Sequence, residues 1–337
     1  MPQTKAIDLA LQGGGSHGAF TWGVLDYLLE SSLVEIEAIS GTSAGAMNAV
    51  AMADGLMRDG KAGARRSLHA FWQGVSRAAM LSPIRRTPLD IWMGDWSLDH
   101  SPGYLAFDLL SRVVSPYQYN PLDINPLRDI LDAQIDFERV HACRQLQLYV
   151  CATNVRTGKQ RVFRNAEVTR DALLASACLP LIYQSIEIDG EHYWDGGYMG
   201  NPTLFPLLEE CDARDIVIIQ TNPICRDQVP STAAEILNRL NEITFNASLI
   251  KEIRTVAMLK RLIEDHDLDI GRYRDALFHR IAEHAFEHLP ASSKFNGEWS
   301  FLRELHDRGR HAAQEWLEAN YDALGERSTL DIDEVYM

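Results

Sequence analysis

Hydrophobic residues in the first two thirds of the chain form short apolar runs that alternate with longer stretches of helical spacing. The stretches Ala19–Leu29 and Ala44–Met57 have the apolar content of buried helices. Strands that alternate with helices predict an α/β fold with three layers, in which helices cover both faces of a mainly parallel central sheet. The runs with the apolar or alternating pattern of β-strands are Ala6–Gln12, Val34–Ser40, Leu146–Thr153 and Asp215–Gln220.

After Pro230 the pattern changes to nearly all helix. Ala233–Asp265 places apolar residues at every third or fourth position, which predicts one long amphipathic helix, and Glu298–Leu324 has a second helical pattern. We therefore predict an α/β domain over residues 1–230 and a helical C-terminal extension over residues 231–337. The apolar stripe of the long helix has to pack against the α/β domain, the following helices or a second copy of the chain.

Residues 83–126 form the least regular part of the pattern. Six prolines interrupt this stretch, and tryptophan, tyrosine and phenylalanine residues lie between them. Prolines break long helices and strands, whereas large aromatic side chains favour burial. We interpret the stretch as an insertion that folds over the functional site, where it lines a pocket or acts as a lid. Packing of a peripheral subdomain is the alternative.

A glycine-rich turn joins the second predicted strand to its helix, with the sequence Gly41-Thr42-Ser43-Ala44-Gly45. It matches G-x-S-x-G, in which the glycines let the chain turn sharply and leave the serine hydroxyl exposed at the start of the helix. We therefore predict that Ser43 is a nucleophile. An ordinary tight turn with a helix-capping serine is the alternative.

A second glycine-rich turn, residues 13–18, lies between the first predicted strand and its helix. Its spacing satisfies the dinucleotide-binding fingerprint, but the next strand has no acidic residue at its carboxyl end, where that fold requires one. Consecutive glycines expose a row of backbone N–H groups beside a helix N-terminus, which suits any anion. We therefore predict an oxyanion hole for a tetrahedral intermediate, formed by Gly13, Gly14, Gly15 and Ser16.

A serine nucleophile requires a general base, and Asp195 is the leading candidate. The stretch Ile186–Trp194 has the pattern of a hairpin that ends in Asp195-Gly196-Gly197, and the two glycines permit close approach of another backbone. Partial desolvation among the neighbouring aromatic residues would raise the basicity of this carboxylate. A histidine base in a conventional triad is the rival hypothesis, with His192 and His279 as residues to test.

Together these motifs resemble those of the patatin-like phospholipases, in particular bacterial members with a helical C-terminal extension. The resemblance covers residues 1–222 and implies a serine–aspartate dyad without histidine, in which Ser43 is the nucleophile and Asp195 the general base. One departure is His17, where the family usually carries arginine or lysine, because an imidazole is mostly neutral at pH 7. The matching motifs, in the order of the family, are Gly13-Gly14-Gly15-Ser16-His17-Gly18, Gly41-Thr42-Ser43-Ala44-Gly45, Ala175–Tyr183 and Asp195-Gly196-Gly197.

Composition sets the expected surroundings of this chemistry. The 337 residues include 32 basic and 47 acidic side chains, and the net charge of −15 argues against nucleic acid as a partner and against tight adhesion to anionic membranes. Five cysteines without a C-x-x-C pair argue against a zinc site, and we predict no cofactor and no metal. Because no apolar stretch approaches a membrane span and no signal-peptide pattern is present, we expect a cytoplasmic protein that contacts membrane surfaces transiently. A homo-oligomer is compatible with the sequence.

These observations favour a serine lipid acyl hydrolase that acts through an acyl-enzyme, such as a phospholipase A, a lysophospholipase or a carboxylesterase on lipid esters. The same dyad would serve an acyltransferase or a depolymerase of a storage polyester, which differ only in the acceptor or the substrate. A non-catalytic lipid-binding protein is a third class, and the presence of both Ser43 and Asp195 argues against it.

Overall fold

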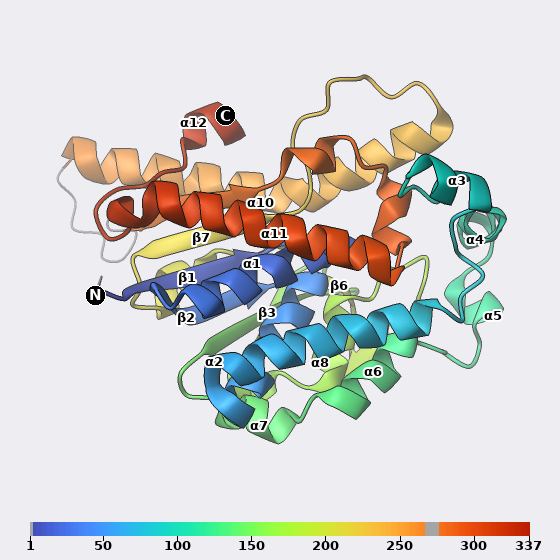
Figure 1. The fold of residues 1–337 in the computed structure, drawn as a ribbon, viewed down its shortest axis with the longest axis horizontal. Helices are drawn as coiled ribbons and strands as arrows, with labels where there is room; N and C mark the ends of the chain where they lie inside the picture. Colours follow the sequence, from blue (N-terminus) through green and yellow to red (C-terminus); the bar gives the residue numbers. More distant parts are fainter. Residues whose placement is uncertain (1–2, 267–275) are drawn as a thin grey trace.

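An eight-stranded sheet forms the centre of the computed structural model, which describes residues 3–266 and 276–337 (Figure 1). Its strands are β1 (Lys5–Leu11), β2 (Val34–Gly41), β3 (Gln147–Asn154), β4 (Gln160–Arg164), β5 (Ile186–Ile188), β6 (Glu191–Asp195), β7 (Asp215–Gln220) and β8 (Leu277–Ala282). The order is β5-β6-β3-β2-β1-β7-β8, with β4 paired to β3. The neighbours from β3 to β8 pair in parallel, whereas β4, β5 and β6 make antiparallel pairs. The mainly parallel sheet is therefore confirmed.

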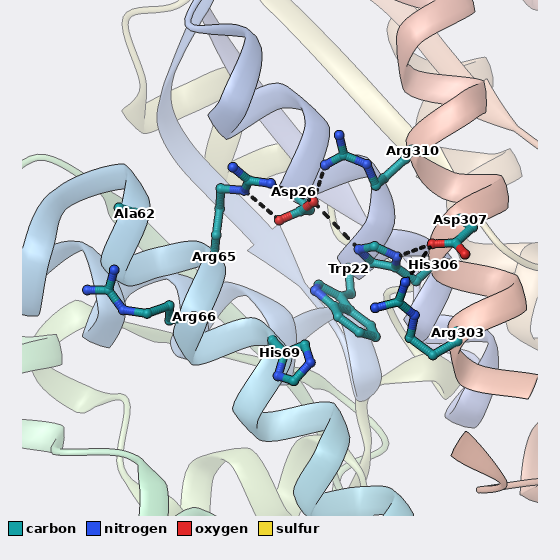
Figure 2. Close-up of a pocket in the computed structure, with 10 residues that line it drawn as sticks. All are labelled: Trp22, Asp26, Ala62, Arg65, Arg66, His69, Arg303, His306, Asp307 and Arg310. Carbon is teal, nitrogen blue, oxygen red and sulfur yellow. Dashed lines mark hydrogen bonds and ion pairs between the residues drawn. The ribbon is translucent and has the colours of Figure 1, made fainter. Parts of the chain in front are cut away.

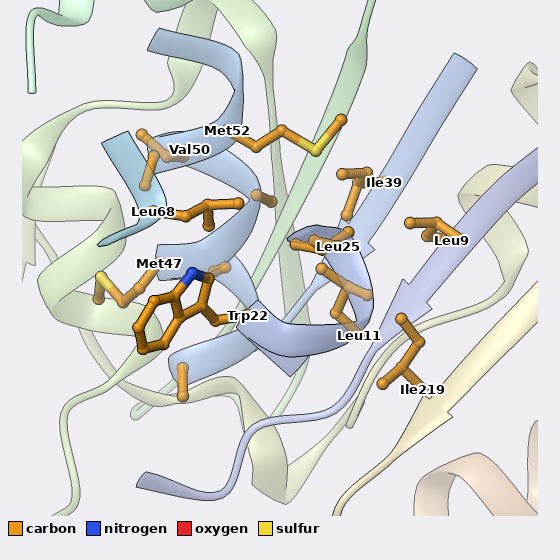
Figure 3. Close-up of a cluster of buried hydrophobic side chains, with 14 of the residues drawn as sticks. Leu9, Leu11, Trp22, Leu25, Ile39, Met47, Val50, Met52, Leu68 and Ile219 are labelled. Atoms are coloured by element: carbon orange, nitrogen blue, oxygen red, sulfur yellow. The ribbon is translucent and has the colours of Figure 1, made fainter. Parts of the chain in front are cut away.

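Helices cover both faces of this sheet, so the predicted three layers are also confirmed. Strand alternation sends Leu9 and Leu11 of β1 to one face and Ala10 to the other. Figure 3 shows the first face, where Leu9, Leu11, Ile39 and Ile219 meet apolar side chains of α1 and α2. The helices of that face include α1 (Gly18–Ser31), α2 (Ala44–Ala79), α8 (Arg170–Ser176) and α11 (Trp299–Asn320), and those of the other face include α9 (Phe205–Glu210), α10 (Ala233–His266) and α12 (Ile332–Tyr336).

The proline-rich segment folds into short helices between α2 and β3, and Figure 1 shows α3, α4 and α5 at one end of the molecule. In each helix that starts within the segment, the proline occupies the beginning and a Thr, Ser or Asn precedes it as the N-cap. Proline is favoured at the first helical position because its missing N–H would be unpaired there in any case. The prolines therefore set where these helices begin: α3 (Pro88–Met93), α4 (Pro102–Val113), α5 (Pro116–Tyr119) and α6 (Pro126–Gln134), followed by α7 (Phe137–Ala142).

The C-terminal region contains the predicted helices and also a strand that the pattern did not predict. Helices α10 and α11 match the two predicted stretches, but β8 pairs in parallel with β7 at the edge of the sheet. Buried His279 interrupts the apolar run of β8, which explains why the strand was missed. Its ring nitrogens lie 2.9 Å from a carboxylate oxygen of Asp215 and 2.8 Å from the hydroxyl of Thr329. Residues 231–337 therefore complete the central sheet as well as adding helices.

Two glycines allow α11 to pack directly against α1. A Cβ on Gly23 would overlap the carbonyl oxygen of His306, and a Cβ on Gly309 would overlap the carbonyl oxygen of Phe20. The two backbones therefore touch, because neither helix presents a side chain at the crossing. This contact fixes the C-terminal helix onto the helix that follows the first glycine-rich turn.

Replacing Gly309 by alanine is expected to lower the free energy of unfolding by about 1–3 kcal/mol, because the added methyl group forces α11 away from α1. Helix propensity alone predicts that the substitution raises the free energy of unfolding, since alanine is a better helix former than glycine. Thermal and denaturant unfolding measure the difference. The control is Gln314→Ala on the exposed side of α11, expected to change stability by less than about 0.5 kcal/mol. A Gly309→Ala variant as stable as wild type would contradict the close packing.

Candidate active site

Strand pairing brings Ser43 and Asp195 together. At Val150, β3 is paired with both β2 and β4, and at Ala152 it is paired with both β4 and β6. Since a strand has two edges, β2 and β6 lie on the same edge of β3 and meet end to end. Gly41, the last residue of β2, is opposite Val150, and Asp195, the last residue of β6, is opposite Ala152. The turn after β2 therefore leads directly to the end of β6.

The backbone of Ser43 is held in a conformation that residues with side chains rarely adopt, with φ 52° and ψ −121°. The glycines around it let the surrounding backbone approach closely, since a Cβ on Gly45 would overlap the carbonyl of Leu11. The N–H of Ser43 donates to the hydroxyl oxygen of Ser176 over 2.9 Å. The predicted sharp turn between a strand and a helix is therefore present, with the Ser43 side chain at the start of α2.

Asp195 is 1% exposed, and the N–H of Gly197 donates to its carboxylate over 2.7 Å. Burial raises the pKa of Asp195 to about 7, and the Gly197 N–H and the Ser43 side chain, which favour the ionised form, limit that rise. Gly197 is required here because a Cβ would overlap the ring of Phe245 on α10. The increase in basicity that the sequence predicts for this aspartate has burial as its main cause.

The first glycine-rich turn presents backbone N–H groups to the same site, but Gly13 does not contribute one. The N–H of Gly13 donates to the side-chain oxygen of Asn201 over 2.7 Å, and its carbonyl accepts from Asn222 over 2.7 Å. Gly13 therefore anchors the turn, and the prediction of its N–H as an oxyanion donor is corrected. Gly14, Gly15 and Ser16 line the pocket, and no hydrogen bond of their N–H groups is found within the described part of the chain.

A cavity of about 540 Å³ opens beside Ser43 and Asp195. Helix α4 contributes Tyr104 and Phe107 to its wall, as expected if residues 83–126 line the pocket, while a lid movement remains a prediction. Helix α10 contributes Leu237 and Phe245, and the lining as a whole is more apolar than polar. The cavity therefore has the lining of a site for an apolar chain.

No histidine lines this cavity among the residues that the structure describes. Nδ1 of His192 lies 3.0 Å from the hydroxyl of Ser185. His279 lies in β8, at the other end of the strand order from β6, and its Nε2 lies 2.9 Å from a carboxylate oxygen of Asp215. Ser43 and Asp195 instead line the cavity together, and the Ser43 side chain favours the ionised form of the carboxylate. The geometry therefore favours the dyad over the histidine triad.

His17 is buried and carries no charge. The hydroxyl of Ser293 donates to the carbonyl of Pro290 over 2.7 Å, so it accepts from Nε2 of His17, which lies 2.8 Å away. Burial lowers the pKa of His17 well below its usual value, and the positive charge of Lys294 adds to this effect. The ring also packs against Phe286, with 4.9 Å between centroids. The imidazole is therefore a neutral packing group in the first glycine-rich turn.

A second cavity, of about 750 Å³, lies between α1, α2 and α11 and shares no lining residue with the first (Figure 2). Its arginines are paired with carboxylates: Arg65 and Arg310 with Asp26, Arg66 with Asp59, and Arg303 with Asp307. The pairs at Asp26 join the three helices. The arginines that line this cavity are therefore compensated within the protein.

One group of side chains has the spacing of a metal site, formed by Asp90, Asp95 and His100. Asp90 accepts hydrogen bonds from Thr87 at the start of α3, and Asp95 accepts from Ser97. Both carboxylates therefore have structural roles in capping and turn formation, far along the chain from the two glycine-rich turns.

An α/β fold with a buried carboxylate that shares a cavity with a serine at a strand-to-helix turn, next to free backbone N–H groups, is suited to acyl transfer through serine. The model of the patatin-like phospholipase family matches residues 9–208, more than half of the chain, and the chain therefore belongs to this family. Its members are generally lipid ester hydrolases. None of the described helices is long and apolar enough to cross a membrane.

Solved structures provide more distant similarities. The chain is similar to VipD from Legionella pneumophila, with 14% identity and a TM-score of 0.43, over 94% of this chain and 67% of VipD. It is also similar to the type III effector ExoU, with 16% identity and a TM-score of 0.32, over 94% of this chain and 54% of ExoU. The chain thus spans about half the length of ExoU. A comparison with curated proteins gives no match.

Four residues of the site were not predicted from the sequence, namely Ser176, Asn201, Asn222 and Lys294. Ser176 lies in the stretch that resembles the family, although its contact with Ser43 has no signal in the pattern. The two asparagines hold the backbone of Gly13, and Lys294 reaches the pocket from the C-terminal region. Contacts between such distant segments depend on the folded sheet and leave no periodic trace in the sequence.

Replacing Ser176 by alanine is expected to lower the free energy of unfolding by about 1–3 kcal/mol, because the N–H of Ser43 would lose its acceptor in a strained turn. Chemical denaturation measures this loss. Ser300→Ala, at an exposed position of α11, is the matched control and is expected to be close to neutral. Equal stability of the two variants would show that Ser176 does not support the turn.

Proposed function

We propose that the protein is a serine lipid acyl hydrolase that uses Ser43 and Asp195 as its dyad. The oxygen of Ser43 attacks the ester carbonyl while Asp195 takes its proton, and the proton passes to the departing alcohol. Water then attacks the acyl-enzyme with Asp195 again as the base, which releases the fatty acid and restores Ser43. The observation that carries this proposal is the buried carboxylate of Asp195 in the same cavity as Ser43, where the Ser43 side chain favours its ionised form.

The surroundings of the dyad support this chemistry. A carboxylate with a pKa of about 7 is a stronger base than one in water and remains partly ionised near neutral pH. The N–H groups of Gly14 and Gly15 line the same pocket and would donate to the oxyanion of the tetrahedral intermediate. These donors are fixed by the fold, so they require little reorganisation when the charge develops.

The apolar cavity favours an acyl chain as the bound part of the substrate. The wall is mainly apolar and includes Phe71, Tyr104, Phe107 and Phe245, and such a wall accepts the hydrocarbon chain of a lipid with any head group. Phospholipase A, lysophospholipase and carboxylesterase activities all fit this arrangement. An acyltransferase or a polyester depolymerase would use the same dyad, and product analysis with a competing alcohol distinguishes transfer from hydrolysis.

Exposed apolar side chains at the cavity and on the adjoining helix α4 support transient contact with a lipid surface. Leu181, Leu237 and Phe295 line the cavity and are also exposed, which places them at its mouth. Leu105 and Leu109 are 53% and 66% exposed on α4, the helix that forms one wall. We call these five side chains the apolar rim. A lipid surface would cover the rim and present acyl chains to the same cavity, so one partner satisfies both features.

Ser43→Ala and Asp195→Asn are each expected to reduce hydrolysis of nitrophenyl butyrate and of phosphatidylcholine by at least about a thousandfold, because each removes one member of the dyad. Circular dichroism and thermal unfolding check that both variants fold. The matched control is Ser300→Ala, which should retain wild-type turnover. Near-normal turnover by folded Asp195→Asn would show that another group is the base, and absence of hydrolysis in wild type would contradict the proposed function.

Replacing two leucines of the apolar rim, as Leu105→Asn/Leu109→Asn in the Ser43→Ala background, is expected to weaken binding to phosphatidylcholine vesicles by about tenfold, because less apolar surface is buried in the lipid. Vesicle flotation measures binding. The same double substitution in active protein should leave nitrophenyl butyrate turnover unchanged.

Leu262→Asn is the control for this experiment, because Leu262 is also exposed but lies near the C-terminal end of α10, whereas the cavity-lining residues of that helix lie in its first half. Unchanged vesicle binding by the double variant would contradict the lipid contact. A wild-type dimer that the double substitution abolishes would also contradict the lipid contact, because a second copy of the chain would then cover the apolar rim.

A further inference from the structure

Lys294 is the one lysine that lines the catalytic cavity in the described part of the chain. It lies in a short 3₁₀ helix, Ala291–Phe295, which packs against the first glycine-rich turn. The contact is between backbones, because a Cβ on Gly15 would come within 2.5 Å of the carbonyl oxygen of Lys294. The C-terminal region thus delivers a basic side chain to the side of the cavity that carries the backbone N–H donors.

The ammonium group of Lys294 is held by a polar side chain that also holds the glycine turn. Lys294 Nζ donates to Oδ1 of Asn222 over 2.7 Å. The amide nitrogen of the same Asn222 donates to the carbonyl of Gly13 over 2.7 Å and to the side-chain oxygen of Gln12 over 3.2 Å. These donations fix which side of the amide faces the lysine. Lys294 is therefore positioned next to the glycine turn by a rigid hydrogen-bond network.

The positive charge of Lys294 has no partner carboxylate within ion-pair distance among the described residues. The nearest acidic influence on it comes from Glu242 on α10, and Glu242 is already paired with Arg226 and Arg239. A half-buried ammonium group without a counter-charge is costly for the folded protein. Such a cost is reduced when an anion enters the cavity.

We propose that Lys294 supplies the positive charge of the oxyanion site and thereby stabilises the tetrahedral intermediate of the reaction. This inference rests on the proposed function, and it assigns to a residue of the C-terminal region the charge that neutral His17 does not provide. The negative charge that develops on the substrate oxygen over Gly14 and Gly15 is the counter-charge of the ammonium group. The effect is electrostatic, so it requires the charge of the side chain rather than its shape.

The charge of Lys294 depends on pH. Burial lowers the pKa of Lys294 to about 8, Glu242 opposes this shift, and Arg226 adds to it, while His17 nearby stays neutral. The protein should therefore need Asp195 deprotonated, which occurs above about pH 7, and Lys294 protonated, which occurs below about pH 8. Wild type is expected to show a bell-shaped profile of kcat/KM between these two limits.

The test compares Lys294→Met and Lys294→Arg with wild type on nitrophenyl butyrate, an uncharged ester, from pH 5.5 to 10. Lys294→Met should lose at least about tenfold in kcat at pH 7.5 and should no longer show the alkaline decrease. Lys294→Arg keeps a charge at all these pH values, so it should retain most of the activity and also lose the alkaline decrease. Lys251→Met, at an exposed position of α10, is the matched control and should behave as wild type.

Several outcomes would overturn the inference. Full activity of Lys294→Met at pH 7.5, or an alkaline decrease that persists in this variant, would show that the charge of Lys294 does not act on the reaction. A loss confined to phospholipids and to KM would show instead that Lys294 binds a phosphate head group. In each case the dependence on Ser43 and Asp195 would still establish the proposed function, whereas wild type without Ser43-dependent hydrolysis would overturn both.

Discussion

The rest of the site depends on the constrained backbone at Ser43. A residue with a side chain at φ 52° and ψ −121° is strained, and surrounding contacts have to hold it there. The carbonyl of Leu11 in β1 lies against Gly45, and Ser176 of α8 accepts the N–H of Ser43. Elements from three parts of the chain therefore hold one turn. Because β1 also leads into the first glycine-rich turn, the same contacts set the distance between the serine and the N–H donors.

Much of the fold was predictable because its strands are short, apolar and separated by helices of clear periodicity. Strands β1, β2, β3 and β7 have continuous or alternating apolar residues, and long helix α10 has a regular apolar stripe. Strand β8 was missed because buried His279 and half-buried Arg280 interrupt its apolar run. His279 can be buried because its ring contacts the carboxylate of Asp215, and a pattern of hydrophobicity does not reveal such a partner.

The site was predictable where local backbone geometry leaves a mark in the sequence. Glycines that flank Ser43 and follow Asp195 are required by close backbone contacts, so both turns could be located. The loss of Gly13 as a donor could not be foreseen, since Asn201 lies 188 residues further along the chain. Lys294 was equally hidden, because its place in the cavity results from the packing of a short helix against Gly15. Such long-range contacts require the three-dimensional structure.

The position of β8 at the edge of the sheet has a consequence for the order in which the protein can be completed during synthesis. Ser43 and Asp195 emerge from the ribosome before β8, and β7 keeps an unpaired edge until β8 has been made. The wall of the cavity is likewise open until Ala291–Phe295 arrives, and α11 closes over α1 later still. A nascent chain that already contains both Ser43 and Asp195 therefore lacks a finished cavity, and these two residues acquire their complete surroundings only after Ala291–Phe295 and α11 have been made.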